Sequence, residues 1–255
     1  MSLEETLLIC AAFFAVAMLY SSVGQAGASG YLAILALGGL APDVMRPTAL
    51  TINMLASAVT VYRFRRAKLF SWSALWPFLA GSLPLAAVGG AISLARGPYY
   101  AVVGSLLIAA SLYMAWRTLR GTFPEKHTPV RARPMPAAFT GGMIGLLSGL
   151  TGIGGGIFLS PLLLFLGWAD AKAAMGVSAP FILANSAVAL AAGSLTVQTL
   201  PPELPLLAAS AVAGALAGTW LGIEKLNARA LLLILALVLA MAGSRLLVVA
   251  WPSVA

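Results

Sequence analysis

A glycine-rich segment runs Gly149-Leu150-Thr151-Gly152-Ile153-Gly154-Gly155-Gly156 and is followed by Ser160-Pro161. So many glycines predict a break in helical structure, because glycine fits strained turns and lets other backbone approach closely. The apolar stretches on either side, 137–150 and 156–167, are too short to span a bilayer upright, and so is the stretch 28–40 in the first half of the chain. The segment therefore predicts broken or re-entrant helices inside a membrane.

The rest of the chain agrees with a membrane location. Its 255 residues are 61% hydrophobic and 9% charged, whereas soluble domains are about half apolar and a quarter charged. Apolar stretches lie at about 6–20, 28–40, 47–62, 73–94, 99–116, 137–150, 156–167, 173–197, 204–222 and 229–250. Several of them reach the roughly 20 residues that a helix needs to cross the bilayer. We predict an all-α polytopic membrane protein.

The two halves of the chain look related. A polar, proline-containing linker at 118–136, predicted to be cytoplasmic, separates a first membrane repeat (1–117) from a second (137–255). A glycine cluster followed by an Asp occurs in the same order in both halves, and Asp43 and Asp170 lie 127 residues apart. Five apolar segments per repeat make the repeats inverted in the membrane, so the short helices of the two halves are expected to meet near the midplane.

The net charge of +8 is interpreted as a signal of orientation. If the loop after the third stretch is cytoplasmic, twelve of the 15 basic residues fall inside, and Arg46, Arg96 and Arg245 remain outside. This bias predicts that both termini lie outside. The same bias explains the positive charge, so no nucleic-acid partner is expected. The lipid bilayer is the expected environment and partner of the chain.

The glycine breaks are the candidate substrate site. Helix ends at a buried break expose unpaired backbone N–H groups, which suit a small anion without a buried lysine. The candidate residues in the second half are Thr151, Gly152, Gly154, Gly155, Gly156 and Ser160. Those in the first half are Ser22, Gln25, Gly27, Ser29 and Gly30. Gln25 is the best single candidate for a direct contact, with loop capping as the equal alternative.

Other polar and aromatic residues have structural alternatives. Asn53 and Asn185 lie in apolar runs, where each could bind substrate or brace a neighbouring helix. The glycine ladders 141/145/149 and 214/218/222 are assigned to helix packing. Six aromatic residues at the ends of apolar stretches are interpreted as interfacial anchors: Trp72, Trp76, Tyr99, Tyr100, Trp168 and Trp251.

Enzymatic chemistry is not expected. Paired carboxylates and a Ser/His/Asp set are missing from the apolar stretches, and the chain has one cysteine, Cys10, and one histidine, His127. The glycine cluster is not a nucleotide motif, because Ile157 interrupts the required spacing and no Lys follows. We expect no cofactor and no metal.

The segment from Gly149 to Leu162, with Gly167 and the Ala-rich stretch 171–178 after it, resembles the TauE/SafE sulfite exporter family. The family pattern is a Gly-x-Gly-Gly-Gly run with a proline five residues on, and it normally occurs twice. Here the first copy is degraded: Gly27-Ala28-Ser29-Gly30 replaces the triple glycine and Leu35 stands at the proline position. Thiosulfate-importing relatives use membrane cysteines, and Cys10 matches none of their positions.

The resemblance implies a bacterial inner-membrane secondary transporter for sulfite, sulfoacetate or other organosulfonates. We predict export by alternating access around a midplane anion site. The coupling ion, proton or sodium, is left open. The alternatives are a passive anion channel, an importer of a different small organic anion, and a membrane enzyme or assembly subunit that moves nothing.

Overall fold

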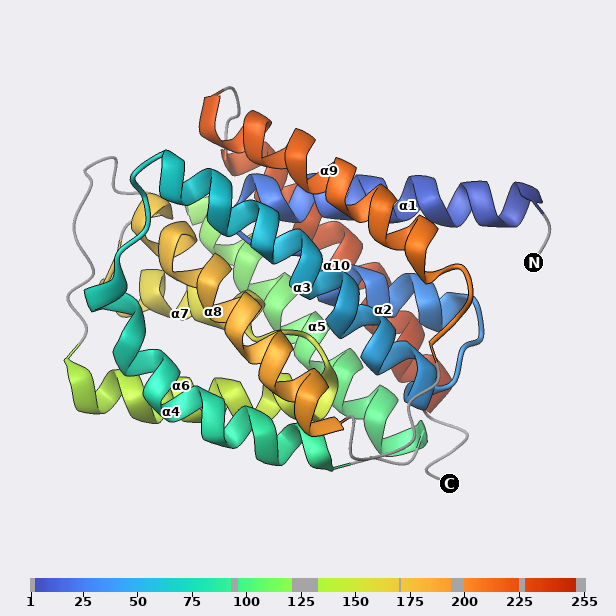
Figure 1. The fold of residues 1–255 in the computed structure, drawn as a ribbon, viewed down its shortest axis with the longest axis horizontal. Helices are drawn as coiled ribbons and strands as arrows, with labels where there is room; N and C mark the ends of the chain where they lie inside the picture. The colour runs from blue at the N-terminus through green and yellow to red at the C-terminus, as the bar shows by residue number, and fades with distance from the viewer. Residues whose placement is uncertain are drawn as a thin grey trace.

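The computed structural model describes residues 3–92, 96–120, 133–169, 171–193, 200–224 and 228–250. All ten elements within these residues are helices, which confirms the all-α prediction. They are α1 (Leu3–Ser22), α2 (Ala28–Leu37), α3 (Pro42–Arg66), α4 (Trp72–Ala91), α5 (Arg96–Arg120), α6 (Pro134–Thr151), α7 (Gly156–Phe165), α8 (Ala171–Gly193), α9 (Leu204–Glu224) and α10 (Ala228–Ala250) (Figure 1).

The helices differ in whether they can cross a membrane. Within the described residues, five are long and apolar enough to do so: α1, α4, α5, α8 and α9. By contrast, α2 and α7 have ten residues each. At 1.5 Å per residue each measures about 15 Å, half of the hydrocarbon thickness. The chain is thus a multi-pass membrane protein with two half-length helices.

The predicted linker is shorter than expected at both ends. Helix α5 continues to Arg120, and α6 already begins at Pro134. Proline suits the start of a helix because its missing N–H would have no intrahelical acceptor there. Residues 121–132 and Asp170 lie outside the described residues.

The main helix pairings repeat when α1–α5 are exchanged with α6–α10. Helix α4 packs on α6, and its counterpart α9 packs on α1. In the same way α4 contacts α8 while α9 contacts α3, and α2 contacts α3 while α7 contacts α8. Two pairs match themselves under this exchange: α3 contacts α8, and α5 contacts α10, so each pair joins the two halves. The related order of the two halves in sequence is therefore matched by related packing.

Glycine ladders permit the closest pairings, as predicted. The two ladders contain three glycines each, and a Cβ added at any of the six would collide with the backbone of the neighbouring helix. On α6, Gly141, Gly145 and Gly149 face Phe78, Ser82 and Ala86 of α4, and on α9, Gly214, Gly218 and Gly222 face Phe14, Met18 and Ser22 of α1. Small residues let helix backbones approach in a membrane, where the hydrophobic effect does not drive helices together.

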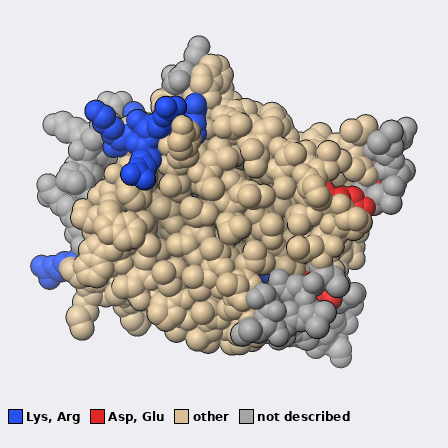
Figure 2. Space-filling view, viewed as in Figure 1, with Lys and Arg blue, Asp and Glu red and all other residues tan. Residues whose placement is uncertain are grey.

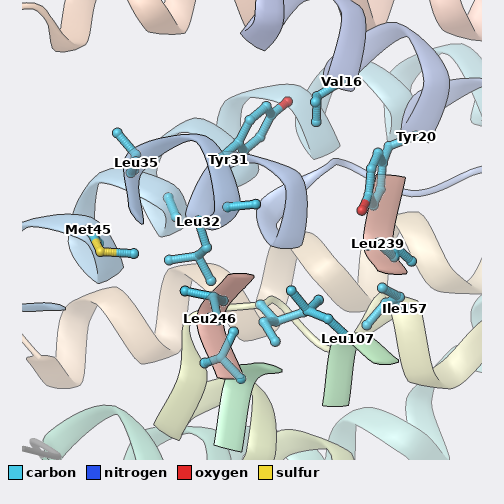
Figure 3. Close-up of a cluster of buried hydrophobic side chains, with 14 of the residues drawn as sticks. Val16, Tyr20, Tyr31, Leu32, Leu35, Met45, Leu107, Ile157, Leu239 and Leu246 are labelled. Atoms are coloured by element: carbon cyan, nitrogen blue, oxygen red, sulfur yellow. The ribbon is translucent and has the colours of Figure 1, made fainter. Parts of the chain in front are cut away.

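Both short helices contribute to the largest apolar cluster (Figure 3). Tyr20 of α1 and Tyr31 of α2 lie in this cluster together with Ile157 of α7 and Leu246 of α10. The starts of α2 and α7 are therefore held by side chains from both halves of the chain.

Charged residues gather at the two ends of the molecule. On the face shown in Figure 2, most Lys and Arg atoms lie at one end and the Asp and Glu atoms lie at the other. The last turn of α3, which carries Arg63, Arg65 and Arg66, lies at this end in the same view of Figure 1. Between the ends the visible surface is almost free of charge, as expected of a surface that faces lipid.

Candidate functional site

The first break, residues 23–27, joins α1 to α2. Gly24 and Gly27 have φ angles of +79° and +96°, in the left-handed region that favours glycine. A Cβ at Gly24 would come within 2.6 Å of the Met175 Cβ, near the start of α8. Four residues later the Ala28 N–H donates a hydrogen bond of 3.1 Å to Asn53 Oδ1. The first break thus runs from the start of α8 to the middle of α3.

The second break, residues 152–155, joins α6 to α7 and also lies against α3. Gly152, Gly154 and Gly155 each have a φ of +77°. A Cβ at Gly152 would come within 2.9 Å of Arg46 Cγ, near the start of α3. A Cβ at Gly154 would collide with Asn53 Nδ2. The second break therefore also reaches Asn53.

Asn53 is the point where the two breaks meet. Its side chain is 1% exposed. Besides accepting from Ala28, it donates through Nδ2 to Ser186 Oγ on α8 at 2.9 Å. Helices α2 and α7 both begin beside this amide, so their N-terminal ends, which carry partial positive charge, approach one buried region. Such a region favours a small anion.

Asn185 is also engaged by the protein. Its Oδ1 accepts from Ser82 Oγ at 2.7 Å and its Nδ2 donates to the Phe181 carbonyl at 2.8 Å. The hydrogen bonds of Asn53 and Asn185 correspond to the bracing alternative. A substrate contact by either amide stays a prediction.

The other predicted hydroxyls have partners within the protein. These pairs are Ser29 with Tyr20 (2.6 Å), Ser160 with Ser178 (2.7 Å), Thr151 with the Leu147 carbonyl (2.6 Å) and Ser22 with the Leu19 carbonyl (2.6 Å). Of the remaining predicted glycines, Gly30 lies against Val16, and Gly156 lies against Ile182. These residues shape the breaks, and a direct contact of any of them with substrate is untested.

A few buried polar atoms have no hydrogen-bond partner. In the described part of the chain they are Gln25 Oε1, Tyr31 Oη, Arg63 Nε and Ser148 Oγ. Three of the four lie at the breaks. Gln25 belongs to the first break, Tyr31 Oη is 3.1 Å from a Cβ built at Gly27, and Ser148 Cβ is 3.4 Å from one built at Gly155. An unpaired buried polar group costs about 1–3 kcal/mol, so this concentration indicates a place where a ligand could supply the missing partner.

Arg46 lies beside the second break, a position that was not predicted from the sequence. Its guanidinium donates to the carbonyls of Gly89, Gly90 and Ile92, at distances of 2.9, 2.5 and 2.6 Å. These carbonyls form the C-terminal end of α4, which attracts a cation. Arg46 thus places a positive charge near the second break while it caps α4.

The interpretation of Tyr99 and Tyr100 as interfacial anchors was wrong. Their side chains are 2% and 7% exposed. Tyr99 donates to the Thr151 carbonyl at 2.8 Å, and Tyr100 donates to the Leu40 carbonyl at 3.2 Å. Tyr99 therefore fixes the end of α6, immediately before the second break. Their place at the start of α5 suggested the interface, but packing of α5 against the interior buries them.

No group of three or more His, Cys, Asp or Glu side chains comes together in the residues that the structure describes. Cys10 is a free thiol buried in α1. The polar groups at the breaks are amides, hydroxyls and backbone N–H groups, which bind ligands by hydrogen bonding.

Comparison with known proteins identifies the family of the chain. The family described as sulfite exporter TauE/SafE matches residues 8–246. The chain belongs to the TauE/SafE family. One relative in that family is a probable membrane transporter protein, y4hK, of Sinorhizobium fredii, which is 37% identical over 244 residues. The alignment covers 95% of this TauE/SafE chain and 98% of the relative. No solved structure matches the chain.

Proposed function

We propose that this TauE/SafE membrane transporter moves small sulfur-containing anions, such as sulfite, sulfoacetate or other organosulfonates, out across the bacterial inner membrane. The concentration of unpaired polar atoms at the two breaks is the observation that carries the proposal. Gln25, Tyr31 and Ser148 leave polar atoms unsatisfied where the N-terminal ends of α2 and α7 converge. A membrane protein has few reasons to keep such groups except to bind what it transports.

The mechanism that fits this arrangement is alternating access between two inverted repeats. The exchange of helix pairings between α1–α5 and α6–α10 supports it. In transporters of this kind the site lies at the repeat interface, and half-helix N-termini point at anionic groups. Asn53 and its partner Ser186 belong to α3 and α8, the matched pair between the halves. Movement of one repeat against the other would open the breaks to each side in turn.

The proposed orientation places the basic end of the molecule inside the cell and both termini outside. The arginines at the end of α3 would then face the cytoplasm, and Arg46 would lie toward the outer side. A proton or a sodium ion is the proposed coupling ion.

The test is flux by the purified protein in proteoliposomes, measured with labelled sulfite and with a panel of sulfonates. Saturable uptake that is accelerated by anion on the opposite side is the expected result for a carrier. The Gln25→Ala variant should fold normally, because the Gln25 carboxamide oxygen has no hydrogen bond to lose, yet it should transport more slowly. A matched control is Ser111→Ala, which removes a buried hydroxyl bonded to the Ala236 carbonyl on α10.

The same experiment separates the alternatives. Current in a planar bilayer without counterflow would identify a passive channel. Uptake of carboxylates but of no sulfur-containing anion would indicate a transporter for a different substrate class. Equal flux by wild type and Gln25→Ala would remove Gln25 from the site.

A further inference from the structure

The two short helices begin differently, although both begin beside Asn53. At the start of α2, the Ala28 N–H is already bonded to Asn53 Oδ1. At the start of α7, no described residue accepts from the N–H groups of Gly156 and Ile157. Helix geometry leaves these first amides without an intrahelical acceptor. The first amide of α2 is therefore capped by the protein, while the next two, of Ser29 and Gly30, have no acceptor among the described residues; at α7 the first two amides are both open.

Ser148 lies next to the open end. It is fully buried in the last turn of α6, and its Cβ is 3.4 Å from a Cβ built at Gly155, the residue before α7. A buried hydroxyl in a helix ordinarily donates to a carbonyl of the preceding turn, as Thr151 does to Leu147. Ser148 Oγ makes no such bond and has no other partner.

The surroundings of Ser148 raise the free-energy cost of leaving its hydroxyl unpaired, and they strengthen a hydrogen bond from that hydroxyl to a charged ligand. Ile144 Cγ2 and Phe181 Cε1 each lie 2.9 Å from the built Cβ of Gly155, so apolar groups line this end of the second break. Low local polarity strengthens a hydrogen bond to an anion and penalises an unpaired donor. A ligand that accepts from Ser148 and from the α7 amides would satisfy both requirements.

We propose that the oxyanion of the substrate is bound at the second break by the N–H groups at the start of α7 and by the Ser148 hydroxyl. This assignment rests on the proposed function; it names the groups that would bind the oxyanion and adds Ser148 as a residue that contacts substrate. The ligand class is a small tetrahedral or pyramidal sulfur oxyanion, whose several oxygens can accept from two amides and a hydroxyl at once. Asn53 then acts as a positioning residue that closes α2.

The test compares wild type, Ser148→Ala and Ser111→Ala by ligand-induced stabilisation with methanesulfonate. Methanesulfonamide, a neutral analogue of similar shape, reports whether the charge is recognised. For Ser148→Ala we expect the Kd for methanesulfonate to rise at least about tenfold, the effect of losing one hydrogen bond to a charged group. The stability of the ligand-free variant should equal or exceed that of wild type, because no protein hydrogen bond is lost. Ser111→Ala should show the opposite: lower ligand-free stability and an unchanged Kd.

Each outcome has one meaning. If wild type neither binds nor transports any sulfur-containing anion, the proposed function fails and this site fails with it. If wild type binds methanesulfonate and Ser148→Ala binds it equally well, only the present assignment is overturned. A ligand-free Ser148→Ala that is destabilised as much as Ser111→Ala would show that the hydroxyl has a structural partner, which also overturns it.

Discussion

Replacing Asn53 with alanine should destabilise the substrate-free protein by roughly 2–5 kcal/mol. The substitution removes the acceptor of the Ala28 N–H and the donor to Ser186. Leaving the buried amide of Ala28 unpaired costs about 1–3 kcal/mol, and a hydrogen bond between membrane helices is worth about 0.6–2 kcal/mol. These two losses are the whole estimate.

The measurement is reversible unfolding of the purified protein in mixed micelles without substrate. Ser57→Ala is the matched control, because Ser57 lies one turn further along α3 and bonds only to the Met54 carbonyl of its own helix. We expect the control to change stability by less than about 1 kcal/mol. A double-mutant cycle of Asn53→Ala with Ser186→Ala should give a coupling of about 1 kcal/mol.

Two results would refute the bracing role. One is a loss of stability no greater than that of Ser57→Ala. The other is additivity of Asn53→Ala and Ser186→Ala, which would mean that the two side chains do not interact. If, instead, Asn53→Ala kept its substrate-free stability and lost only the stabilisation by methanesulfonate, Asn53 would be a direct substrate contact.

Three further substitutions test the geometry elsewhere. Gly154→Ala should prevent accumulation of folded protein, because its Cβ would collide with Asn53 in addition to the strain at φ +77°. The control Gly167→Ala, at φ +64° with open space around it, should lower the unfolding free energy by only about 1–2 kcal/mol in the same assay. Equal effects of the two substitutions would contradict the close approach of Gly154 to Asn53. Arg46→Gln should lower the unfolding free energy by about 2 kcal/mol, because the cap of α4 weakens, and Arg46→Lys should recover part of the loss. Wild-type stability in Arg46→Gln would contradict the capping role. Lys68→Gly should raise the unfolding free energy by about 1 kcal/mol, because Lys68 has a φ of +57° after the end of α3, and an unchanged value would show that this strain is compensated.

Much of the fold could be predicted because its signals are local. A run of apolar residues and the thickness of a bilayer together give the position of a helix, so α2 and α7 were expected as short elements. The spacing of Gly141, Gly145 and Gly149 predicts a flat helix face without knowledge of the partner helix. Helix ends were less predictable, as Pro134 shows, because proline can either end an apolar segment or begin a helix.

The site could be predicted only by segment. Asn53 and Ser186 are 133 residues apart, and their hydrogen bond depends on how α3 and α8 cross. Ser148 and Thr151 lie in the same turn of α6 and look equivalent in sequence. Thr151 donates to Leu147 whereas Ser148 stays unpaired, a difference set by the neighbours of each side chain.

The departures of the first glycine motif from the family pattern coincide with the place where the protein caps its own helix. In that copy Ala28 begins α2, and its N–H is satisfied by Asn53. Applying the 127-residue spacing of Asp43 and Asp170 to Asn53 leads to Pro180, whose side chain has no hydrogen-bonding group. The second half therefore has no equivalent cap at that position, and the first amide of α7, unlike that of α2, has no acceptor among the described residues. At this position the degraded copy is thus expected to brace the fold through Asn53, and the intact copy to offer its first amide to the anion.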